Sequence, residues 1–235
     1  MDKTAVCLIS GGLDSSVAAY LAKSEGYKIY AISFNYSQRH EKEIESAKKI
    51  ASSVNSKNHI LYDIDLSKFG SSSLVDKSLN LEKDHNLDEI GKKIPSTYVP
   101  ARNTIFLSIA LAYAEAIDAE VIFIGATATD YSGYPDCRPE YFEAFQKMAD
   151  IATKKCVEGK PIKINAPLLY STKAEIIKKG LKLGVPFEKT WSCYMGGKKA
   201  CGRCDSCLLR LKGFKEAQAS DPIEYESLPE WYIKK

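Results

Sequence analysis

The fold of this chain is decided by the stretch Cys7-Leu8-Ile9-Ser10-Gly11-Gly12-Leu13-Asp14-Ser15-Ser16. It starts in the apolar run 6–9, long enough for a buried strand, and continues into an apolar helical pattern over 13–23. Two glycines in between let the backbone turn tightly and approach a ligand, and the following helix presents unpaired N–H groups and a partial positive charge. The stretch therefore predicts a phosphate-binding turn. The alternative is a plain serine-capped turn, since the loop matches neither the Walker A pattern nor the dinucleotide fingerprint.

Outside this stretch, apolar runs alternate with helical patterns. We expect strands at 28–34, 59–62 and 121–124, and a further strand that ends in the apolar run 167–170. We expect helices at 41–53, at 103–117, from Pro139 onward and at 172–183. Residues 67–95 lack a clear period, which indicates a surface excursion with one helical turn near 87–91. The alternation predicts an α/β fold, a Rossmann-like, mostly parallel sheet flanked by helices. We expect residues 1–190 to form this domain and 191–235 a small lobe of the same compact unit.

The composition is that of an ordinary globular protein. Of its 235 residues, 45% are hydrophobic and 27% charged, which excludes a disordered or fibrous chain. With 33 basic and 30 acidic residues the net charge is only +3, which argues against a long nucleic-acid footprint. No apolar run approaches the ~20 residues of a membrane span, and the N-terminus shows no signal segment. We therefore expect a cytoplasmic protein that binds neither membranes nor nucleic acid.

Four of the seven cysteines crowd into the segment 193–207. Cys193, Cys201, Cys204 and Cys207 follow the spacing C-x7-C-x2-C-x2-C. Four thiolates with no open position are typical of a structural zinc site, so we expect one structural Zn²⁺ that folds the C-terminal lobe, in a reducing compartment. Two alternatives stay open. One is an iron–sulfur site, although the expected cysteine–proline ending does not follow Cys207, and the other is a redox-active thiol pair.

Three further loops, at 33–40, 98–104 and 125–138, concentrate polar side chains. Such loops border ligands when they follow the carboxyl ends of strands in an open parallel sheet. Arg102 suits a carboxylate or phosphate partner, and carboxylates beside tyrosines suit the edge and the face of an amino-purine. The candidate substrate-binding residues are Gln38, Arg39, His40, Arg102, Asn103, Asp130, Tyr131, Tyr134, Asp136 and Arg138. The simpler alternatives are helix caps and a solvated, tyrosine-rich loop.

Ser-Gly-Gly-x-Asp-Ser after a first strand resembles the pyrophosphate loop of the ATP pyrophosphatase superfamily, whose members cleave ATP between the α and β phosphates and adenylate a substrate oxygen. The resemblance implies Mg²⁺ near Asp14 and a lysine, Lys173, that reaches the α-phosphate. The pyrophosphate would lie against Ser10, Gly11, Gly12, Asp14 and Ser15. The full set of implied ATP-binding residues is Leu8, Ile9, Ser10, Gly11, Gly12, Leu13, Asp14, Ser15, Ser16, Val17, Ala18 and Ser33. Asp14, Lys173 and Arg102 are the candidate catalytic residues, because the two cations offset charge at phosphorus.

The chain as a whole resembles the 7-cyano-7-deazaguanine synthase family of the queuosine precursor pathway. The resemblance rests on the glycine loop, the four cysteines, and the segments 36–40, 99–103 and 130–138; Ser37 stands where the family is expected to have glycine. It implies a ligase that forms carbon–nitrogen bonds from 7-carboxy-7-deazaguanine, ammonia and two ATP, through an adenylated acid and an amide. It also implies a homodimer, and Asp130 and Asp136 as readers of the guanine-like edge. Because no glutamine-hydrolysing domain is recognisable in the sequence, we expect free ammonia as the nitrogen source.

Two other functions stay open at the level of sequence. Relatives in the superfamily thiolate tRNA with cysteine persulfides, and Cys137 in a candidate substrate loop is a candidate nucleophile of that kind. The other alternative is a non-catalytic RNA-binding protein whose zinc knuckle contacts phosphates through Lys198, Lys199 and Arg203. The mild net charge and the unexplained polar loops favour the nitrile-forming enzyme over both.

Overall fold

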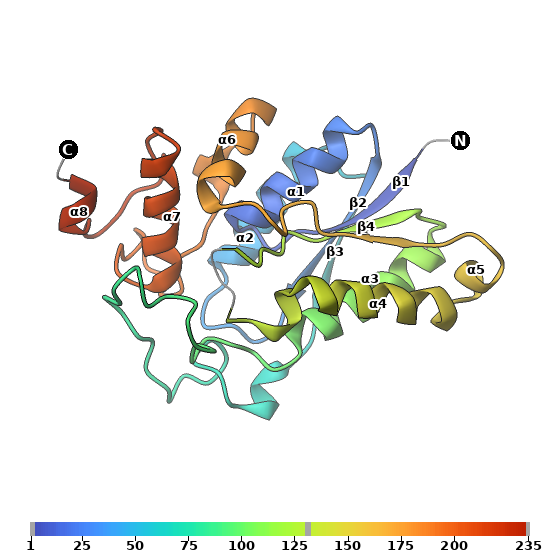
Figure 1. Cartoon of the computed structure of the whole chain (residues 1–235), viewed down its shortest axis with the longest axis horizontal. Helices are drawn as coiled ribbons and strands as arrows, with labels where there is room; N and C mark the ends of the chain where they lie inside the picture. Colours follow the sequence, from blue (N-terminus) through green and yellow to red (C-terminus); the bar gives the residue numbers. More distant parts are fainter. Residues whose placement is uncertain (1–2, 130–132, 234–235) are drawn as a thin grey trace.

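The computed structural model describes residues 3–129 and 133–233 and shows a five-stranded sheet in which every pair of neighbours is parallel. The strand order is β3-β2-β1-β4-β5. The strands are β1 (Thr4–Leu8), β2 (Lys28–Asn35), β3 (Asn58–Asp63), β4 (Val121–Phe123) and β5 (Lys163–Asn165). This confirms the α/β class and the parallel sheet (Figure 1).

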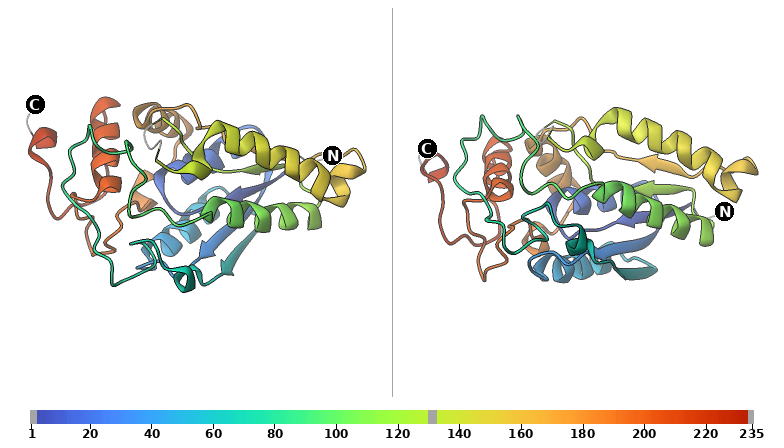
Figure 2. Two further views of the ribbon diagram at one scale, coloured as in Figure 1. Left: turned by 60° about the horizontal axis from the view of Figure 1, so that its bottom comes forward. Right: turned by 90° about the horizontal axis from the view of Figure 1, so that it is seen from below.

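Helices cover both faces of this sheet, as the turned views show (Figure 2). One face carries α1 (Leu13–Ser24) and α2 (Lys42–Ser53), with α6 (Lys173–Leu183) beside α1. The other face carries α3 (Arg102–Ala116) and α4 (Pro139–Ala152), followed by the short α5 (Lys154–Val157). The described ranges also contain short 3-10 segments, namely η1 (Leu66–Phe69), η2 (Pro135–Cys137) and η3 (Phe187–Lys189). None of the helices in the described ranges has the length and apolarity to span a bilayer.

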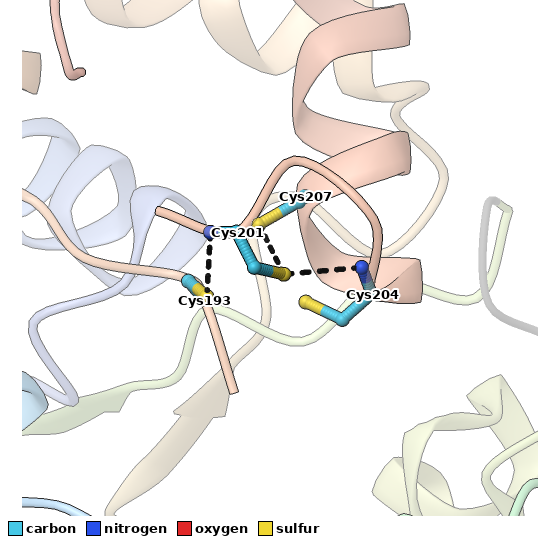
Figure 3. Close-up of side chains that lie close together, drawn as sticks. All are labelled: Cys193, Cys201, Cys204 and Cys207. Carbon is cyan, nitrogen blue, oxygen red and sulfur yellow. Dashed lines mark hydrogen bonds between the residues drawn. The ribbon is translucent and has the colours of Figure 1, made fainter. Parts of the chain in front are cut away.

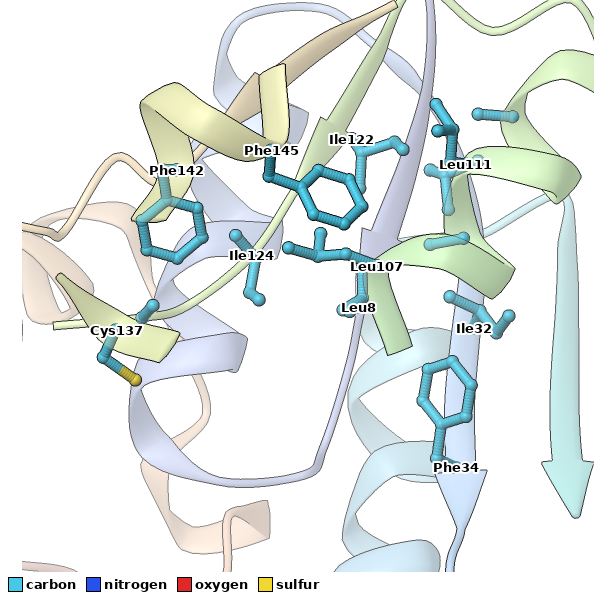
Figure 4. Close-up of a cluster of buried hydrophobic side chains, with 14 of the residues drawn as sticks. Leu8, Ile32, Phe34, Leu107, Leu111, Ile122, Ile124, Cys137, Phe142 and Phe145 are labelled. Atoms are coloured by element: carbon cyan, nitrogen blue, oxygen red, sulfur yellow. The ribbon is translucent and has the colours of Figure 1, made fainter. Parts of the chain in front are cut away.

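The main core lies between the sheet and the helices α3 and α4. Leu107 of α3 and Ile122 of β4 are completely buried, and Phe142 and Phe145 of α4 pack over them (Figure 4). Full burial of such side chains stabilises a fold by about 1.5–3 kcal/mol each. The core thus holds the carboxyl ends of β1 and β4 rigidly beside the start of α3.

The C-terminal segment contains a helix that the sequence patterns did not predict. This helix, α7 (Asp205–Glu216), packs against α6, and Phe214 joins the hydrophobic cluster of Val17 and Ile176. A short last helix, α8 (Glu230–Ile233), follows. The division of the chain into 1–190 and 191–235 stays a prediction.

Two local expectations were wrong. The apolar run 167–170 is a turn rather than the end of a strand, because the strand before it, β5, already ends at Asn165. Residues 87–91 form a hydrogen-bonded turn and no helix. Both segments are short, and tertiary contacts decide the conformation of short segments.

Candidate functional site

A cavity of about 290 Å³ opens at the carboxyl ends of β1, β2 and β4. Strand β1 lies between β2 and β4 in the sheet: the chain first winds outward from β1 through β2 to β3 and then returns to β4 on the other side of β1. Ligands of open parallel sheets bind at such a reversal of strand order. Of the residues predicted from sequence, those lining the cavity are Leu8, Ile9, Ser10, Gly12, Leu13, Asp14, Ser15, Ser33, Gln38, Arg102, Asn103, Tyr134 and Lys173. Sequence segments far apart therefore meet in one place.

The glycine loop is held against the first turn of α2. Gly11 has a φ of +81°, and a Cβ atom there would lie 2.3 Å from the carbonyl oxygen of Glu43. Only glycine satisfies both the left-handed backbone and this close approach. The Ser10 and Ser15 hydroxyls lie 2.9 Å apart, and Ser16 donates a 2.7 Å hydrogen bond to the Gly12 carbonyl oxygen. Helix α1 therefore begins at the cavity with its first N–H groups directed toward a phosphate-sized space.

Lys173 and Asp14 form an ion pair at the edge of this loop. The ammonium nitrogen lies 2.7 Å and 2.8 Å from the two carboxylate oxygens. Lys173 is the first residue of α6, whose start is fixed by a capping box between Thr172 and Glu175. The pair places one cation and one carboxylate beside the loop, which are the groups that a phosphate chain and its metal ion require.

Arg102 faces the cavity from the first position of α3. Its guanidinium carbon lies 5.8 Å from the centroid of the Tyr36 ring. Burial opposes the charged form, but the facing Tyr36 and Tyr134 hydroxyls raise the pKa of Arg102 on balance, so the guanidinium stays charged. Burial also raises the pKa of Tyr36 to about 12. Arg102 is therefore a buried cation that lines the same cavity as the glycine loop.

Glu43, in the first turn of α2, also lines the cavity, and the sequence reasoning missed it. Burial raises the pKa of this carboxyl to about 7; the Arg102 charge opposes the shift, and the Cys193 thiol adds to it more weakly. The segment 41–53 was predicted only as a helix, with no functional residue on it. Its position, just after the polar loop that follows β2, was the available signal.

Aromatic side chains form one wall of the cavity. The rings of Phe34 and Phe106 stack in parallel, with centroids 4.0 Å apart and an angle of 3°. The Tyr36 ring packs against Phe106 with centroids 5.6 Å apart. Tyr134 also lines the cavity and shares a 2.9 Å hydrogen bond with the Thr97 hydroxyl. This wall suits a flat, partly apolar ring system. The two phenylalanines were not among the predicted site residues.

Several predicted substrate residues have structural partners and do not line the cavity. Arg39 donates to the carbonyl oxygens of Ser73, Asp76 and Leu79 and so anchors the excursion to the domain. His40 bonds through Nε2 to the Cys193 carbonyl oxygen at 2.9 Å.

The loop before α4 also contains predicted substrate residues that do not line the cavity. Asp136 is buried and accepts the Asn103 backbone N–H at 2.9 Å, so its carboxylate caps α3. Arg138 is exposed just before α4. The calls on Asp130 and Tyr131 lie outside the described residues.

Three residues of the predicted ATP-binding segment are likewise buried away from the cavity. Ser16, Val17 and Ala18 lie in α1, and Val17 and Ala18 pack against the hydrophobic side of α6. Gly11 does not line the cavity directly, because its space is filled by α2.

The four clustered cysteines converge as the spacing predicts. All four are buried free thiols, and their sulfur atoms lie within 4.8 Å of one another (Figure 3). The backbone N–H of Cys201 donates to Cys193 Sγ, and the backbone N–H of Cys204 donates to Cys201 Sγ, each with a nitrogen–sulfur distance of 3.3 Å. Converging sulfurs that accept N–H groups fit a tetrahedral metal ion. The cluster therefore can hold a metal.

Cys137 lines the cavity but is not an activated thiol. Burial raises its pKa to about 11, and Asn103 Nδ2 donates to the sulfur over 3.2 Å. A reactive cysteine needs the opposite, a lowered pKa and exposure. The side chain is 8% exposed and packs with the core around Phe142.

Comparison with known proteins gives one consistent family. Residues 4–218 match the family model described as queuosine biosynthesis protein QueC. The 7-cyano-7-deazaguanine synthase of Thermoplasma acidophilum is 56% identical over 230 residues, covering 98% of this chain and 95% of that protein. The 7-cyano-7-deazaguanine synthase of Trichodesmium erythraeum is 54% identical over 219 residues, which cover 93% of this chain and 99% of that protein. A 4-thiouridine synthetase–RNA complex with bound ATP is similar only at 20% identity and a TM-score of 0.48, over 92% of this chain and 50% of that one, a likeness too weak to bear on function.

Proposed function

The chain belongs to the family of the queuosine biosynthesis protein QueC, and on that premise we propose that it converts 7-carboxy-7-deazaguanine, ammonia and ATP to 7-cyano-7-deazaguanine. The observation that carries the proposal is the cavity at the carboxyl ends of the strands. It brings the glycine loop, Lys173, Arg102 and the aromatic wall together around one space. A phosphate chain and a flat acid therefore meet there.

The first stage is adenylation of the acid. A carboxylate resists attack because oxide is a very poor leaving group, whereas AMP bound through one carboxylate oxygen leaves readily. The acid oxygen attacks the α-phosphorus and pyrophosphate departs toward the glycine loop. Lys173 and Arg102 stabilise the charge that develops on the phosphoryl oxygens. Mg²⁺ held near Asp14 would neutralise part of the phosphate charge.

The second stage replaces both oxygens by nitrogen. Ammonia displaces AMP to give an amide. A second ATP then adenylates the amide oxygen, and loss of the second AMP with the remaining N–H protons leaves the nitrile. Each of the two oxygens leaves on one AMP, so two ATP are consumed for every nitrile.

We assign recognition of the ring to residues that face the cavity. The stacked Phe34 and Phe106 border a slot for a planar ring, and Gln38, Asn103 and Tyr134 offer polar groups at its edge. Gln38 is already held in place, because its Oε1 accepts the Tyr36 backbone N–H at 2.8 Å. Asp130 and Tyr131 stay candidate readers.

We propose that the four cysteines bind one structural Zn²⁺. The support is the donor set, four buried sulfurs with N–H donors around them, which is closed and leaves no position for a substrate. Two of the three cations considered for a phosphate-binding knuckle already have carboxylate partners, Arg203 with Asp84 and Lys199 with Glu224, which disfavours that role. A reducing, cytoplasmic setting fits unpaired thiols of this kind. A homodimer that acts on small molecules rather than on nucleic acid completes the proposal.

One reaction mixture tests this function. The purified protein is incubated with 7-carboxy-7-deazaguanine, ammonium chloride, magnesium and ATP, and the products are followed by mass spectrometry and nucleotide chromatography. The nitrile with about two AMP per turnover is expected. AMP without nitrile would retain the adenylating site but refute the substrate, and the absence of AMP would refute the ATP site. A Cys137→Ser variant that still makes nitrile would exclude a thiolation mechanism through that sulfur.

A further inference from the structure

We propose that Glu43 is the proton acceptor of the amide-forming step, a role that rests on the function proposed above. Ammonia that attacks the acyl adenylate forms a C–N bond while the C–O bond to AMP breaks. The nitrogen becomes acidic once it is bonded to carbon, and it must lose one proton to give the neutral amide. The chemistry therefore needs a base inside the cavity.

The residues around the cavity narrow the choice of base. Among the described lining residues, two carry carboxylates, Asp14 and Glu43, and none is a histidine. Asp14 is bound by the Lys173 ammonium through both oxygens. Tyr36 and Cys137 hold their protons too tightly, since burial raises their pKa values to about 12 and about 11. Within the part of the chain that the structure describes, Glu43 is left as the lining carboxylate that forms no ion pair.

The position of Glu43 is fixed relative to the reacting groups. Its carbonyl oxygen lies against Gly11 of the glycine loop, so close that a Cβ atom there would come within 2.3 Å. Glu43 lines the cavity from the same turn of α2, and Arg102 lies near enough to act on its carboxyl group electrostatically. A carboxyl that shares the cavity with the phosphate loop and the arginine stands where an adenylated acid would meet its nucleophile.

The acid–base behaviour of the group agrees with this position. Burial raises the pKa of Glu43 to about 7. General bases work best when their pKa is close to the operating pH. The carboxylate is thus available to accept the proton and the acid is able to release it again.

The test separates adenylation from amide formation. Wild type, Glu43→Gln and Glu43→Asp are compared in two assays at one neutral pH. The first is the acid-dependent exchange of labelled pyrophosphate into ATP without ammonium. The second is amide and nitrile formation with ammonium chloride. Glu45→Gln is the matched control, because Glu45 is an exposed residue of the same helix turn.

For Glu43→Gln we expect exchange within about threefold of wild type and a ~100-fold loss of kcat/KM for ammonium, the size of a lost general base. Glu43→Asp should recover part of that loss, and Glu45→Gln should match wild type in both assays. Equal losses of exchange and amide formation in Glu43→Gln would overturn the proposal, because the residue would then serve ATP binding or the fold. Unchanged amide formation would overturn it as well. A wild-type protein that exchanges pyrophosphate but makes no amide would instead refute the proposed function.

Discussion

The nucleotide end of the cavity and the cysteine cluster are both built for a charged ligand, yet they are assembled in opposite ways. The four cysteines lie within residues 193–207, and their sulfurs converge through local turns. The ion pair beside the glycine loop joins Asp14 to Lys173, which are 159 positions apart. A local cluster can be identified from its spacing, whereas a distant pair exists only after the sheet has formed.

The two regions are nevertheless mechanically connected. The Trp191 backbone N–H donates to the Gly11 carbonyl oxygen at 2.9 Å, two residues before Cys193. His40, in the loop that follows β2, bonds to the Cys193 carbonyl oxygen. In the same C-terminal segment, the buried Arg210 and Asp221 form an ion pair with Nε 2.7 Å from Oδ2. The segment that carries the cysteine cluster is therefore hydrogen-bonded to the glycine loop and to the loop that follows β2.

Of the changes to these two regions, loss of a metal ligand from the cysteine cluster should have the largest effect on stability. Cys204→Ser removes one of four ligands, and we expect unfolding of the C-terminal lobe with a loss on the order of 5 kcal/mol of stability. Metal content by mass spectrometry and thermal unfolding measure it. Cys156→Ser, at a half-buried thiol outside the cluster, should keep the metal and nearly all of the stability. A metal-free Cys204→Ser protein with wild-type melting would contradict the supporting role.

The second test removes Lys173, the partner of Asp14 that lies far away in the sequence, and leaves the cysteine cluster intact. Lys173→Ala should lower kcat for AMP formation by about 10²–10³-fold, because a preorganised cation at the reacting phosphate is lost. Lys178→Ala, an exposed lysine of the same helix, is the matched control and should stay within about twofold. Metal content and melting temperature should be unchanged in both. A Lys173→Ala enzyme with normal AMP formation would separate the pair from catalysis.

The third test addresses the close approach of loop and helix. Gly11→Ala should destabilise the protein by about 3 kcal/mol and weaken ATP binding, since the new Cβ would meet Glu43, Ser46 and Ala47 at a φ of +81°. Gly26→Ala is the control, because Gly26 has a φ of +82° but no atom within 4 Å of its added Cβ. That variant should lose only about 1 kcal/mol. Equal losses measured by denaturant unfolding would show that backbone strain alone, and not the contact with α2, makes glycine necessary.

The smallest effect is expected at Ser37. This residue has a φ of 63°, a left-handed conformation that favours glycine. Ser37→Gly should relieve about 1 kcal/mol of strain and lose the side-chain hydrogen bond to Asp65. The net change in the free energy of unfolding should therefore be under about 1 kcal/mol, with unchanged activity. A large loss of activity would mean that the hydroxyl contacts a substrate.

The departure at Ser37 also shows how a sequence pattern carries physical information. Glycine was expected at this position from the resemblance alone, without a reason. The positive φ supplies the reason, since the chain must turn sharply between the end of β2 and Gln38. The serine accepts the strain and keeps the turn.

Other features could not be predicted from the sequence, and the structure shows the physical reason in each case. Helix α7 has no simple apolar stripe, because its Arg210 is 2% exposed and neutralised by Asp221, so a charged residue occupies a core position. Asp136 and Arg39 looked like substrate readers because polar loops after strands often bind ligands. Their partners, a helix N-terminus and three carbonyl oxygens, come from other segments.

The sequence by itself determined the strand–glycine loop–helix unit, the parallel α/β class and the set of four cysteines. Each depends on residues that are neighbours along the chain, and local backbone preferences and spacing act over that range. Only the tertiary structure decided that Lys173 pairs with Asp14 and that Glu43 faces the cavity. It also decided that Asp136 caps a helix. Such contacts depend on how packed elements close on one another, and burial then sets the charge and the proton affinity of each side chain.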